Sequence, residues 1–479
     1  MIYGIASVMP RVISVILVAV LTGTIGTVDF SEQATWYIYA QFLNVLLTLG
    51  LETSFFRYYT HATDKEKVVS TSFIMMINSC IICLIIGFLG VDYWTSFFDF
   101  SNTLFLKILL ITTVIDTMTV IPYAYLRVHK QSVKFMVIKI LNVVILFVLS
   151  ILFLVLIPKI LIKEPGLMAQ FSFLRDYQPG VIQVISANLI ASIATLLMLM
   201  PIIIKIKWDF DRSIAKKMLN YGLPIMVGGI AYAINEHLDK LIIPHFIDEN
   251  TNGIYAACYK LGVFMTLYIT AFRMGAEPFF FSQSKEASAK SDYSKIMTWF
   301  VIAGSFFMLM VVSFIDLLAS LFLRQAVYLQ GLYIVPIILL ANLFSGIYSN
   351  LGVWYKLTDK TYFGMFISII GALLTIVTLL ILIPLFGILG AAIATLITYF
   401  CMAALSYYLG RSRYPIPYQI GKIMFYISIS TLLSGLSFYW FRGNYWFSAL
   451  TFITYASVVY YLEQSAINSM IMPLREKQN

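Results

Sequence analysis

The chain contains 479 residues, of which 60% are hydrophobic and only 11% are charged, and its mean hydropathy is +0.88. A soluble globular chain has about 45–50% apolar and about 25% charged residues, so this composition excludes soluble enzymes, disordered proteins and disulfide-rich scaffolds. The apolar runs extend for about twenty residues, the length of a bilayer-spanning helix. They lack the short alternating pattern of an outer-membrane barrel. The composition therefore predicts an all-α polytopic membrane protein.

Apolar windows bounded by Pro, Gly and charged residues predict fourteen transmembrane helices. The least regular windows are 252–282, which is long and carries charge, and 446–463, which is short. The expected limits, in chain order, are 2–22, 33–51, 68–91, 103–126, 135–158, 180–204, 218–245, 252–282, 294–322, 330–355, 361–384, 387–409, 418–440 and 446–463.

The Lys and Arg residues between these spans alternate from one side of the membrane to the other. With the N-terminus in the cytoplasm, the inner segments hold 22 basic residues and the outer segments hold 6. Cytoplasmic loops of membrane proteins are enriched in Lys and Arg. The count therefore predicts that both termini are cytoplasmic. It also explains the net charge of +9 without a nucleic-acid partner.

Weak internal similarity indicates two related halves. Tyr3-Gly4 opens the first span and Tyr221-Gly222 opens the seventh; Tyr125-Leu126-Arg127 ends the fourth and Tyr355-Lys356-Leu357 ends the tenth. Copies with an even number of helices face the same way, as a parallel repeat, and transporters built like this place the substrate site between the halves. The expected domains are a six-helix lobe at 1–207, a second six-helix lobe at 208–412, and two extra helices with a short cytoplasmic tail at 413–479.

Polar residues recur at helical spacing within several spans, although polar and charged groups are costly in a bilayer. Such stripes predict helix faces that line a water-filled cavity rather than lipid. The expected lining residues are Ser7 and Ser14 on the first span, Gln41, Asn44, Thr48 and Glu52 on the second, and Tyr259, Thr266 and Thr270 on the eighth.

Two arginines interrupt apolar spans at similar depth. Arg11 and Arg273 each lie roughly 14 Å from the inner end of the predicted helix, at 1.5 Å per residue. Two such arginines would attract an anion, and their forked donors suit phosphate. The alternative is internal pairing, for example between Arg273 and Glu277 one turn away. Arg57, at the inner mouth of the second span, fits either an anion site or an ordinary loop charge.

Acidic residues within the spans permit two interpretations. Asp116, which has no basic neighbour on its own helix, is a candidate proton or cation site or a hydrogen-bond partner of a neighbouring helix. Glu236 and Lys240 have the i, i+4 spacing of a structural ion pair. The four cysteines lie in apolar segments, and no catalytic motif or metal-ligand spacing is present. We therefore expect no metal, no cofactor and no enzymatic activity.

Motifs spread over nearly the whole chain carry a family resemblance. In chain order they are Tyr3-Gly4-Ile5-Ala6-Ser7, Gly50-Leu51-Glu52-Thr53-Ser54-Phe55-Phe56-Arg57, Tyr221-Gly222-Leu223-Pro224, Gly253-Ile254-Tyr255-Ala256-Ala257, Glu277-Pro278-Phe279, Trp354-Tyr355-Lys356-Leu357-Thr358-Asp359-Lys360-Thr361 and Gly387-Ile388-Leu389-Gly390-Ala391-Ala392-Ile393-Ala394-Thr395. With fourteen predicted spans, this order resembles the Wzx-type O-antigen and capsule flippases of the multidrug/oligosaccharidyl-lipid/polysaccharide exporter superfamily.

The resemblance implies two six-helix lobes around a central cationic cavity, with two C-terminal helices forming a groove for a lipid tail. It implies a flippase of the bacterial inner membrane that moves undecaprenyl-diphosphate-linked oligosaccharide repeat units to the periplasmic leaflet by alternating access. The products would serve O-antigen, capsule or exopolysaccharide assembly. Arg11, Arg57 and Arg273 would bind the diphosphate, and the polar stripes would bind sugar hydroxyls.

The same resemblance sets expectations for coupling and partners. A proton or sodium ion taken up by Asp116 or Glu277, or the membrane potential, would drive release of the anionic substrate. The expected partners are the lipid-linked glycan, membrane lipids, and glycan polymerase and assembly proteins. The expected oligomeric state is a monomer.

Other functions predict different features. A peptidoglycan-precursor flippase would use the same basic residues. A drug or cation antiporter of the same superfamily would have twelve spans and an acidic cavity. A membrane glycosyltransferase or polymerase would have a large periplasmic loop, whereas the longest outer segment here is only 159–179. The sequence therefore favours the flippase, then the antiporter, then the enzyme.

Overall fold

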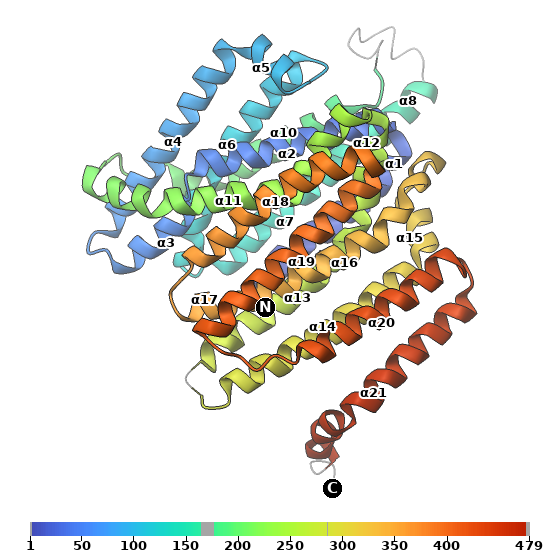
Figure 1. Ribbon diagram of the computed structural model, residues 1–479. Coiled ribbons are helices and arrows are strands. Elements are labelled where there is room, and N and C mark those ends of the chain that lie inside the picture. Colours follow the sequence, from blue (N-terminus) through green and yellow to red (C-terminus); the bar gives the residue numbers. More distant parts are fainter. Residues whose placement is uncertain (1, 164–176, 285, 476–479) are drawn as a thin grey trace. The chain divides into compact units, whose positions relative to one another are not determined.

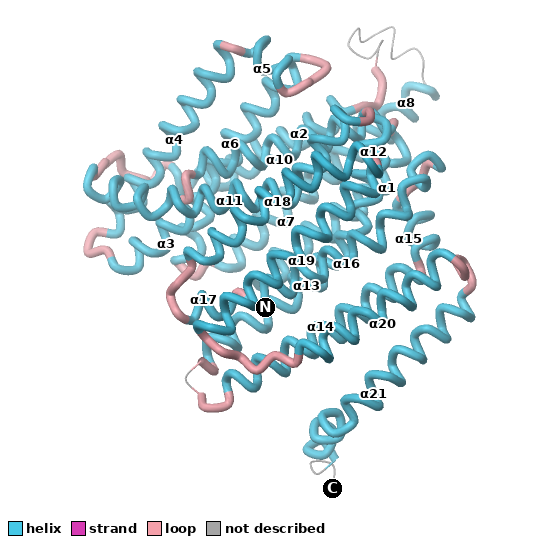
Figure 2. The backbone as a smooth tube through the Cα atoms, viewed as in Figure 1, coloured by secondary structure: helices cyan, strands magenta, loops and turns pink. Residues whose placement is uncertain are grey.

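Helices account for all the regular secondary structure of the computed structural model, which describes residues 2–163, 177–284 and 286–475. Figure 2 shows helices and loops, and no strand, over these ranges. Eleven helical segments are long and apolar enough to cross a membrane, and α1 adds a shorter apolar stretch at Val8–Thr24. The predicted all-α polytopic fold is confirmed.

The first six predicted spans are all helical. A short helix, α5, was not predicted. The bounds are α1 (Ile2–Thr24), α2 (Thr27–Thr48), α3 (Leu51–His61), α4 (Lys65–Leu89), α5 (Val91–Phe97), α6 (Thr103–Val128), α7 (Ser132–Ile151), the π-helical turn η1 (Leu152–Leu156), α8 (Ile157–Lys163) and α10 (Val181–Ile203).

The remaining eight predicted spans are also helical. The bounds are α11 (Arg212–Phe246), α12 (Glu249–Tyr259), η3 (Lys260–Gly262), α13 (Val263–Ser282), α14 (Ala289–Ser313), α15 (Ile315–Phe322), η4 (Ala326–Ile334), α16 (Val335–Leu351), α17 (Val353–Leu357), α18 (Tyr362–Phe386), α19 (Ile388–Arg413), α20 (Ile420–Tyr439) and α21 (Tyr445–Arg475).

Several windows predicted as single helices are interrupted, three of them in the second half of the chain. A 3₁₀ turn, η3, separates α12 from α13, so the stripe from Tyr259 to Thr270 does not follow one continuous α-helix. The 294–322 window is divided between α14 and α15. The 330–355 window begins within the 3₁₀ segment η4 and becomes α-helical at α16, where Pro336 occupies the first turn. Proline is tolerated there because the first-turn N–H groups have no intrahelical partner.

A left-handed turn separates α2 from α3. Leu49 and Gly50 have φ angles of 50° and 66°, a region that favours glycine. A side chain at Gly50 would also collide with the carbonyl of Gly222 on α11. The turn therefore allows the inner end of the second predicted span to lie directly against α11.

The chain forms two compact units. Unit 1 comprises Met1–Lys260, Phe322–Leu332 and Thr361–Thr398; unit 2 comprises Leu261–Leu321, Tyr333–Lys360 and Tyr399–Asn479. In unit 1, α2 packs on α6, α11 and α12, and α11 packs along α18 (Figure 1). In unit 2, α14 packs on α16 and α20 (Figure 1). These units are defined by how closely the helices pack, and they differ from the predicted domains. The predicted lobes at 1–207 and 208–412 and the helix pair at 413–479 stay a prediction.

Polar contacts join α2 to α12 at one end of unit 1. The Asn252 amide donates to the Ser31 hydroxyl at 2.7 Å, and the Thr27 hydroxyl is hydrogen-bonded to the side chain of Asn250. Gly253 faces the Thr27 main chain so closely that a Cβ atom would overlap it. This end of α2 is the predicted periplasmic end.

Candidate functional site

In unit 2, the carboxylate of Glu277 is paired with two positively charged side chains. Arg273 Nη2 donates to Glu277 Oε1 at 3.1 Å within α13, and Lys356 Nζ on α17 donates to the same oxygen at 2.6 Å. The three side chains are 45%, 38% and 32% exposed for Arg273, Glu277 and Lys356, so a ligand can reach them. The i, i+4 pair anticipated from spacing is present, and Lys356 extends it into a network.

An apolar cluster fixes α17 beside α13. Ala276 and Phe280 from α13 are buried against Tyr293 of α14 and Val353 of α17. The Tyr293 hydroxyl donates to the Phe280 carbonyl at 2.6 Å. Because these residues flank Glu277 and Lys356 in sequence, their packing positions the ammonium group against the carboxylate.

Unit 1 contains a comparable pair. Arg127 Nη1 at the end of α6 donates to Glu52 Oε1 on α3 at 2.9 Å, and its guanidinium lies 4.6 Å from the centroid of the Phe56 ring. Arg57, on the same short helix as Glu52, lies 4.4 Å from the centroid of the Tyr221 ring. Both arginines are exposed at the predicted cytoplasmic end of unit 1.

The turn after Arg127 in unit 1 and the turn after Lys356 in unit 2 have the same backbone geometry. Lys130, after α6, and Asp359, after α17, both have left-handed φ angles, of 57° and 54°. One residue later, Gln131 N donates to the Leu126 carbonyl at 2.9 Å and Lys360 N donates to the Tyr355 carbonyl at 2.8 Å. The offset from Lys130 to Asp359 equals the offset from Arg127 to Lys356. A duplicated helical unit would produce this correspondence, and the duplication stays a prediction.

Asp116 lies within unit 1, where α6, α7 and α10 meet. Lys139 on α7 provides a neighbouring positive charge. The Lys139 ammonium lies 4.9 Å from the centroid of the Tyr123 ring. Both interpretations of Asp116, as a hydrogen-bond partner of a neighbouring helix and as a proton or cation site, therefore stay open. A role in ion coupling stays a prediction.

A second polar cluster in unit 1 is almost fully buried. Lys240 Nζ lies 2.9 Å from Asp239 Oδ1, and the Tyr255 hydroxyl donates to Asp239 Oδ2 at 2.6 Å. Lys240 also lies 3.4 Å from the centroid of the Tyr259 ring and donates to the main-chain oxygen of Glu236. Tyr259, expected to line a cavity, is therefore buried beneath an ammonium group.

The other predicted lining residues lie on the expected helices. Arg11 and Ser14 are exposed on α1, and Gln41 is exposed on α2. The side chain of Ser7 lies outside the described residues. Four of the polar side chains donate hydrogen bonds to main-chain carbonyls of their own helix: Ser14 to Pro10, Thr48 to Val45, Thr266 to Val263, and Thr270 to Thr266. Asn44 on α2 donates to the Thr117 hydroxyl on α6. Joint binding of one diphosphate by Arg11, Arg57 and Arg273 stays a prediction.

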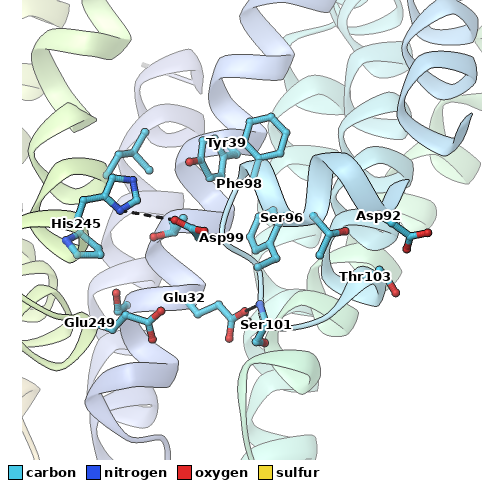
Figure 3. A pocket seen from close by; sticks show the side chains of 16 residues that line it. Glu32, Tyr39, Asp92, Ser96, Phe98, Asp99, Ser101, Thr103, His245 and Glu249 are labelled. Carbon is cyan, nitrogen blue, oxygen red and sulfur yellow. Dashed lines mark hydrogen bonds and ion pairs between the residues drawn. The ribbon is translucent and has the colours of Figure 1, made fainter. Parts of the chain in front are cut away.

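An acidic cavity at the other end of α2 was not predicted. It has a volume of about 620 Å³ and contains the carboxylates of Glu32, Asp92, Asp99 and Glu249 (Figure 3). Asp99 Oδ2 lies 3.6 Å from His245 Nδ1. These acidic residues lie in different segments of the chain, so their spacing in the sequence does not predict that they share a cavity. The charge along α2 thus runs from acidic at its start to basic beyond its end, in keeping with the predicted orientation.

Three basic residues of the clusters were counted in the sequence only as loop charges. Arg127, Lys139 and Lys356 instead belong to α6, α7 and α17 and contact acids or aromatic rings. The signal that could have identified Lys356 was its place at the end of the tenth predicted span, since Arg127 ends the fourth.

Solved structures with this fold are membrane transporters. The lipid II flippase MurJ, in an inward closed conformation, matches with a TM-score of 0.69 and 15% identity over 95% of this chain and 98% of its own. An inward-facing multidrug resistance MATE family transporter matches with a TM-score of 0.66 and 14% identity over 86% and 98%. A MOP superfamily transporter from Pyrococcus furiosus matches with a TM-score of 0.57 and 16% identity over 86% and 95%.

These likenesses define the class: the chain is a polytopic membrane protein with the fold of MOP superfamily transporters. The family model for polysaccharide biosynthesis proteins matches residues 1–283. The chain belongs to this family. No curated protein sequence matches it.

Proposed function

We propose that the chain is a flippase for undecaprenyl-diphosphate-linked oligosaccharide repeat units. It moves them from the cytoplasmic to the periplasmic leaflet of the bacterial inner membrane by alternating access, for O-antigen, capsule or exopolysaccharide assembly. Membership of the polysaccharide biosynthesis family and the MOP transporter fold support a transporter in a glycan pathway. The assignment of a lipid-diphosphate substrate goes beyond this support and is the proposal itself.

The observation that carries the proposal is the cation pair on Glu277. Arg273 and Lys356 converge on one carboxylate oxygen at 3.1 and 2.6 Å, and all three side chains are partly exposed. Guanidinium and ammonium groups are the donors that proteins use for phosphate. Glu277 is therefore an internal anion in the position that a substrate diphosphate would take.

Binding and release follow from this exchange. The diphosphate displaces Glu277 from Arg273 and Lys356, the prenyl tail stays in lipid, and polar helix faces replace water around the sugars, which otherwise could not cross hydrocarbon. When the site opens outward, Glu277 competes again for Arg273 and Lys356 and expels the diphosphate, and the membrane potential favours outward movement of the anion by about 2.3 kcal/mol per charge per 100 mV.

Alternating access requires a seal that opens. The contacts of Asn252 with Ser31 and of Gly253 with Thr27 close the α2–α12 interface at the predicted periplasmic end. The Thr22 hydroxyl, which donates to the Phe322 carbonyl at 2.7 Å, adds to them. Opening this end of unit 1 requires these hydrogen bonds and the close main-chain approach to separate.

A drug or cation antiporter is the second candidate. Asp116 favours it, because a carboxylate within a membrane helix is a natural proton or cation site. A peptidoglycan-precursor flippase shares the diphosphate chemistry and differs only in the glycan.

The test uses the full-length protein in proteoliposomes. Translocation is measured for a fluorescent undecaprenyl-diphosphate oligosaccharide, for a fluorescent peptidoglycan precursor lipid and for a cationic dye with a proton gradient. The proposal expects movement of the oligosaccharide lipid. Movement of the dye alone identifies the antiporter, and selective movement of the peptidoglycan precursor identifies the other flippase.

A further inference from the structure

A groove beside α7, here called the α7 groove, lies outside every cluster described above. It consists of two cavities of about 630 and 230 Å³ that share Gln131 and Lys134 in their walls. The ends of α6 and α10, the loop after α10 and the starts of α4 and α7 surround it. All of these segments belong to unit 1 and to its predicted cytoplasmic end.

The polar part of the groove is basic. Lys130, Lys134, Lys205 and Lys207 contribute ammonium groups, against the single carboxylate of Glu66. Glu66 is already paired with Lys207, and its hydrogen bond and charge raise the pKa of that lysine. Among the described residues, the ammonium groups of Lys130, Lys134 and Lys205 form no ion pair. Three positive charges therefore face the groove without a counterion from the protein.

The start of α7 adds to this charge. The α7 N-cap residue, Gln131, makes no side-chain capping hydrogen bond. Residues 131–134 line the larger cavity, so the first-turn N–H groups and the positive end of the helix dipole lie at the same place as Lys130 and Lys134.

The other wall of the groove is apolar and continues along the helix. Val133, Val137 and Leu141 line the larger cavity and are 57%, 43% and 39% exposed. Val144 and Val148 continue the same exposed face. From Val133 to Val148 the face is about 22 Å long at 1.5 Å per residue, more than the hydrocarbon half of a bilayer at about 15 Å. Trp208, 75% exposed after α10, is typical of the membrane–water interface.

We propose that the α7 groove binds an anionic phospholipid of the cytoplasmic leaflet. The headgroup phosphate lies among Lys130, Lys134 and Lys205 at the start of α7, and one acyl chain lies along the valine and leucine face. Basic pockets between membrane helices at the cytoplasmic side bind anionic lipid headgroups. A soluble phosphate would use only the lysines, whereas the continuous apolar face specifies a ligand that carries an acyl chain. This inference does not depend on the flippase proposal.

The test measures retention of phosphatidylglycerol by the full-length protein in native mass spectrometry, with phosphatidylcholine and glycerol phosphate as comparison ligands. The variant combines Lys130→Gly, Lys134→Gln and Lys205→Gln. Glycine suits the left-handed φ of 57° at position 130, so this change removes charge without straining the turn. The matched control, Lys216→Gln with Lys217→Gln and Lys290→Gln, removes the same charge from exposed sites on the same predicted side.

The proposal expects wild type to prefer phosphatidylglycerol over phosphatidylcholine and the groove variant to bind it at least about tenfold more weakly, since each lysine near an anionic leaflet adds measurable affinity. The control binds as wild type, and an all-arginine groove variant retains binding, which separates loss of charge from misfolding. Equal loss in the control would contradict the proposal. Competition by glycerol phosphate at the same concentration as the lipid would also overturn it, because the acyl chain would then contribute nothing.

Discussion

Lys356 and Glu277 lie 79 residues apart in the chain, yet Lys356 Nζ is 2.6 Å from Glu277 Oε1. In unit 1, Arg127 and Glu52 lie 75 residues apart and are joined at 2.9 Å. In each case a carboxylate near the inner end of one predicted span meets a basic residue at the inner end of the span two further along. The repeated pairing agrees with the predicted duplication of a helical unit. In unit 2 it also recruits Arg273.

Glu277→Gln tests the role of Glu277 as a replaceable anion. Glutamine fills the same space without a charge, so an incoming diphosphate no longer competes with a carboxylate for Arg273 and Lys356. We expect the Kd for an undecaprenyl-diphosphate analogue to fall about three- to tenfold, the size expected for charge-assisted contacts at a partly exposed site. Transport is expected to slow because release loses its driving anion. An unchanged or higher Kd would show that Glu277 does not occupy the substrate's position.

The sequence was informative where interactions are local. Arg273 and Glu277 are one helical turn apart, so their pairing followed from spacing alone. Lys356 reaches the same carboxylate from another helix, and only three-dimensional packing by Val353 and Phe280 brings it there. The positions of the apolar spans were likewise predictable from hydropathy. The turn at Lys260–Gly262 was not, because the length and charge of the 252–282 window marked it as irregular without showing where its helix is interrupted.

Gly253→Ala tests the closed α2–α12 interface. A Cβ atom at this position overlaps the Thr27 main chain, so α2 and α12 must move apart. We expect destabilisation of about 1–3 kcal/mol, typical of overpacking, measured by thermal unfolding in detergent. Gly435→Ala on α20 is the control, because its Cβ meets nothing within 4 Å. Equal melting temperatures for the two variants would mean that the α2–α12 contact does not limit stability.

The Asp239–Lys240 pair is expected to stabilise unit 1 only as an intact pair. The two side chains are 5% and 8% exposed, so Lys240→Met leaves an uncompensated carboxylate and should cost about 3–5 kcal/mol. Adding Asp239→Asn removes that charge while keeping an acceptor for Tyr255, and should recover part of the loss. Asp99→Asn, which breaks the exposed pair with His245, should cost less than about 1 kcal/mol. Additive losses in the Asp239/Lys240 double variant would contradict this account.

Buried polar clusters show where sequence reasoning stops. Glu236 and Lys240 have ideal helical spacing, and Lys240 also contacts the carboxylate of its chain neighbour, Asp239, which spacing did not identify. The contact between Lys240 and Asp239 is enclosed by Tyr255 from α12, whose hydroxyl donates to Asp239. Spacing along one helix identifies which groups can meet, whereas burial by a second helix decides which of them do.

The most direct measurement is the initial rate of undecaprenyl-diphosphate-oligosaccharide translocation in proteoliposomes by Arg273→Ala, Lys356→Ala and Arg442→Ala. Arg442 is the matched control, since it also belongs to unit 2, is 39% exposed and pairs with a carboxylate, Asp316. We predict losses of at least about tenfold for Arg273→Ala and Lys356→Ala, each equivalent to roughly 1.4 kcal/mol, and a wild-type rate for Arg442→Ala. Wild-type rates for Arg273→Ala and Lys356→Ala, in protein that is folded and inserted, would contradict a diphosphate site at Glu277.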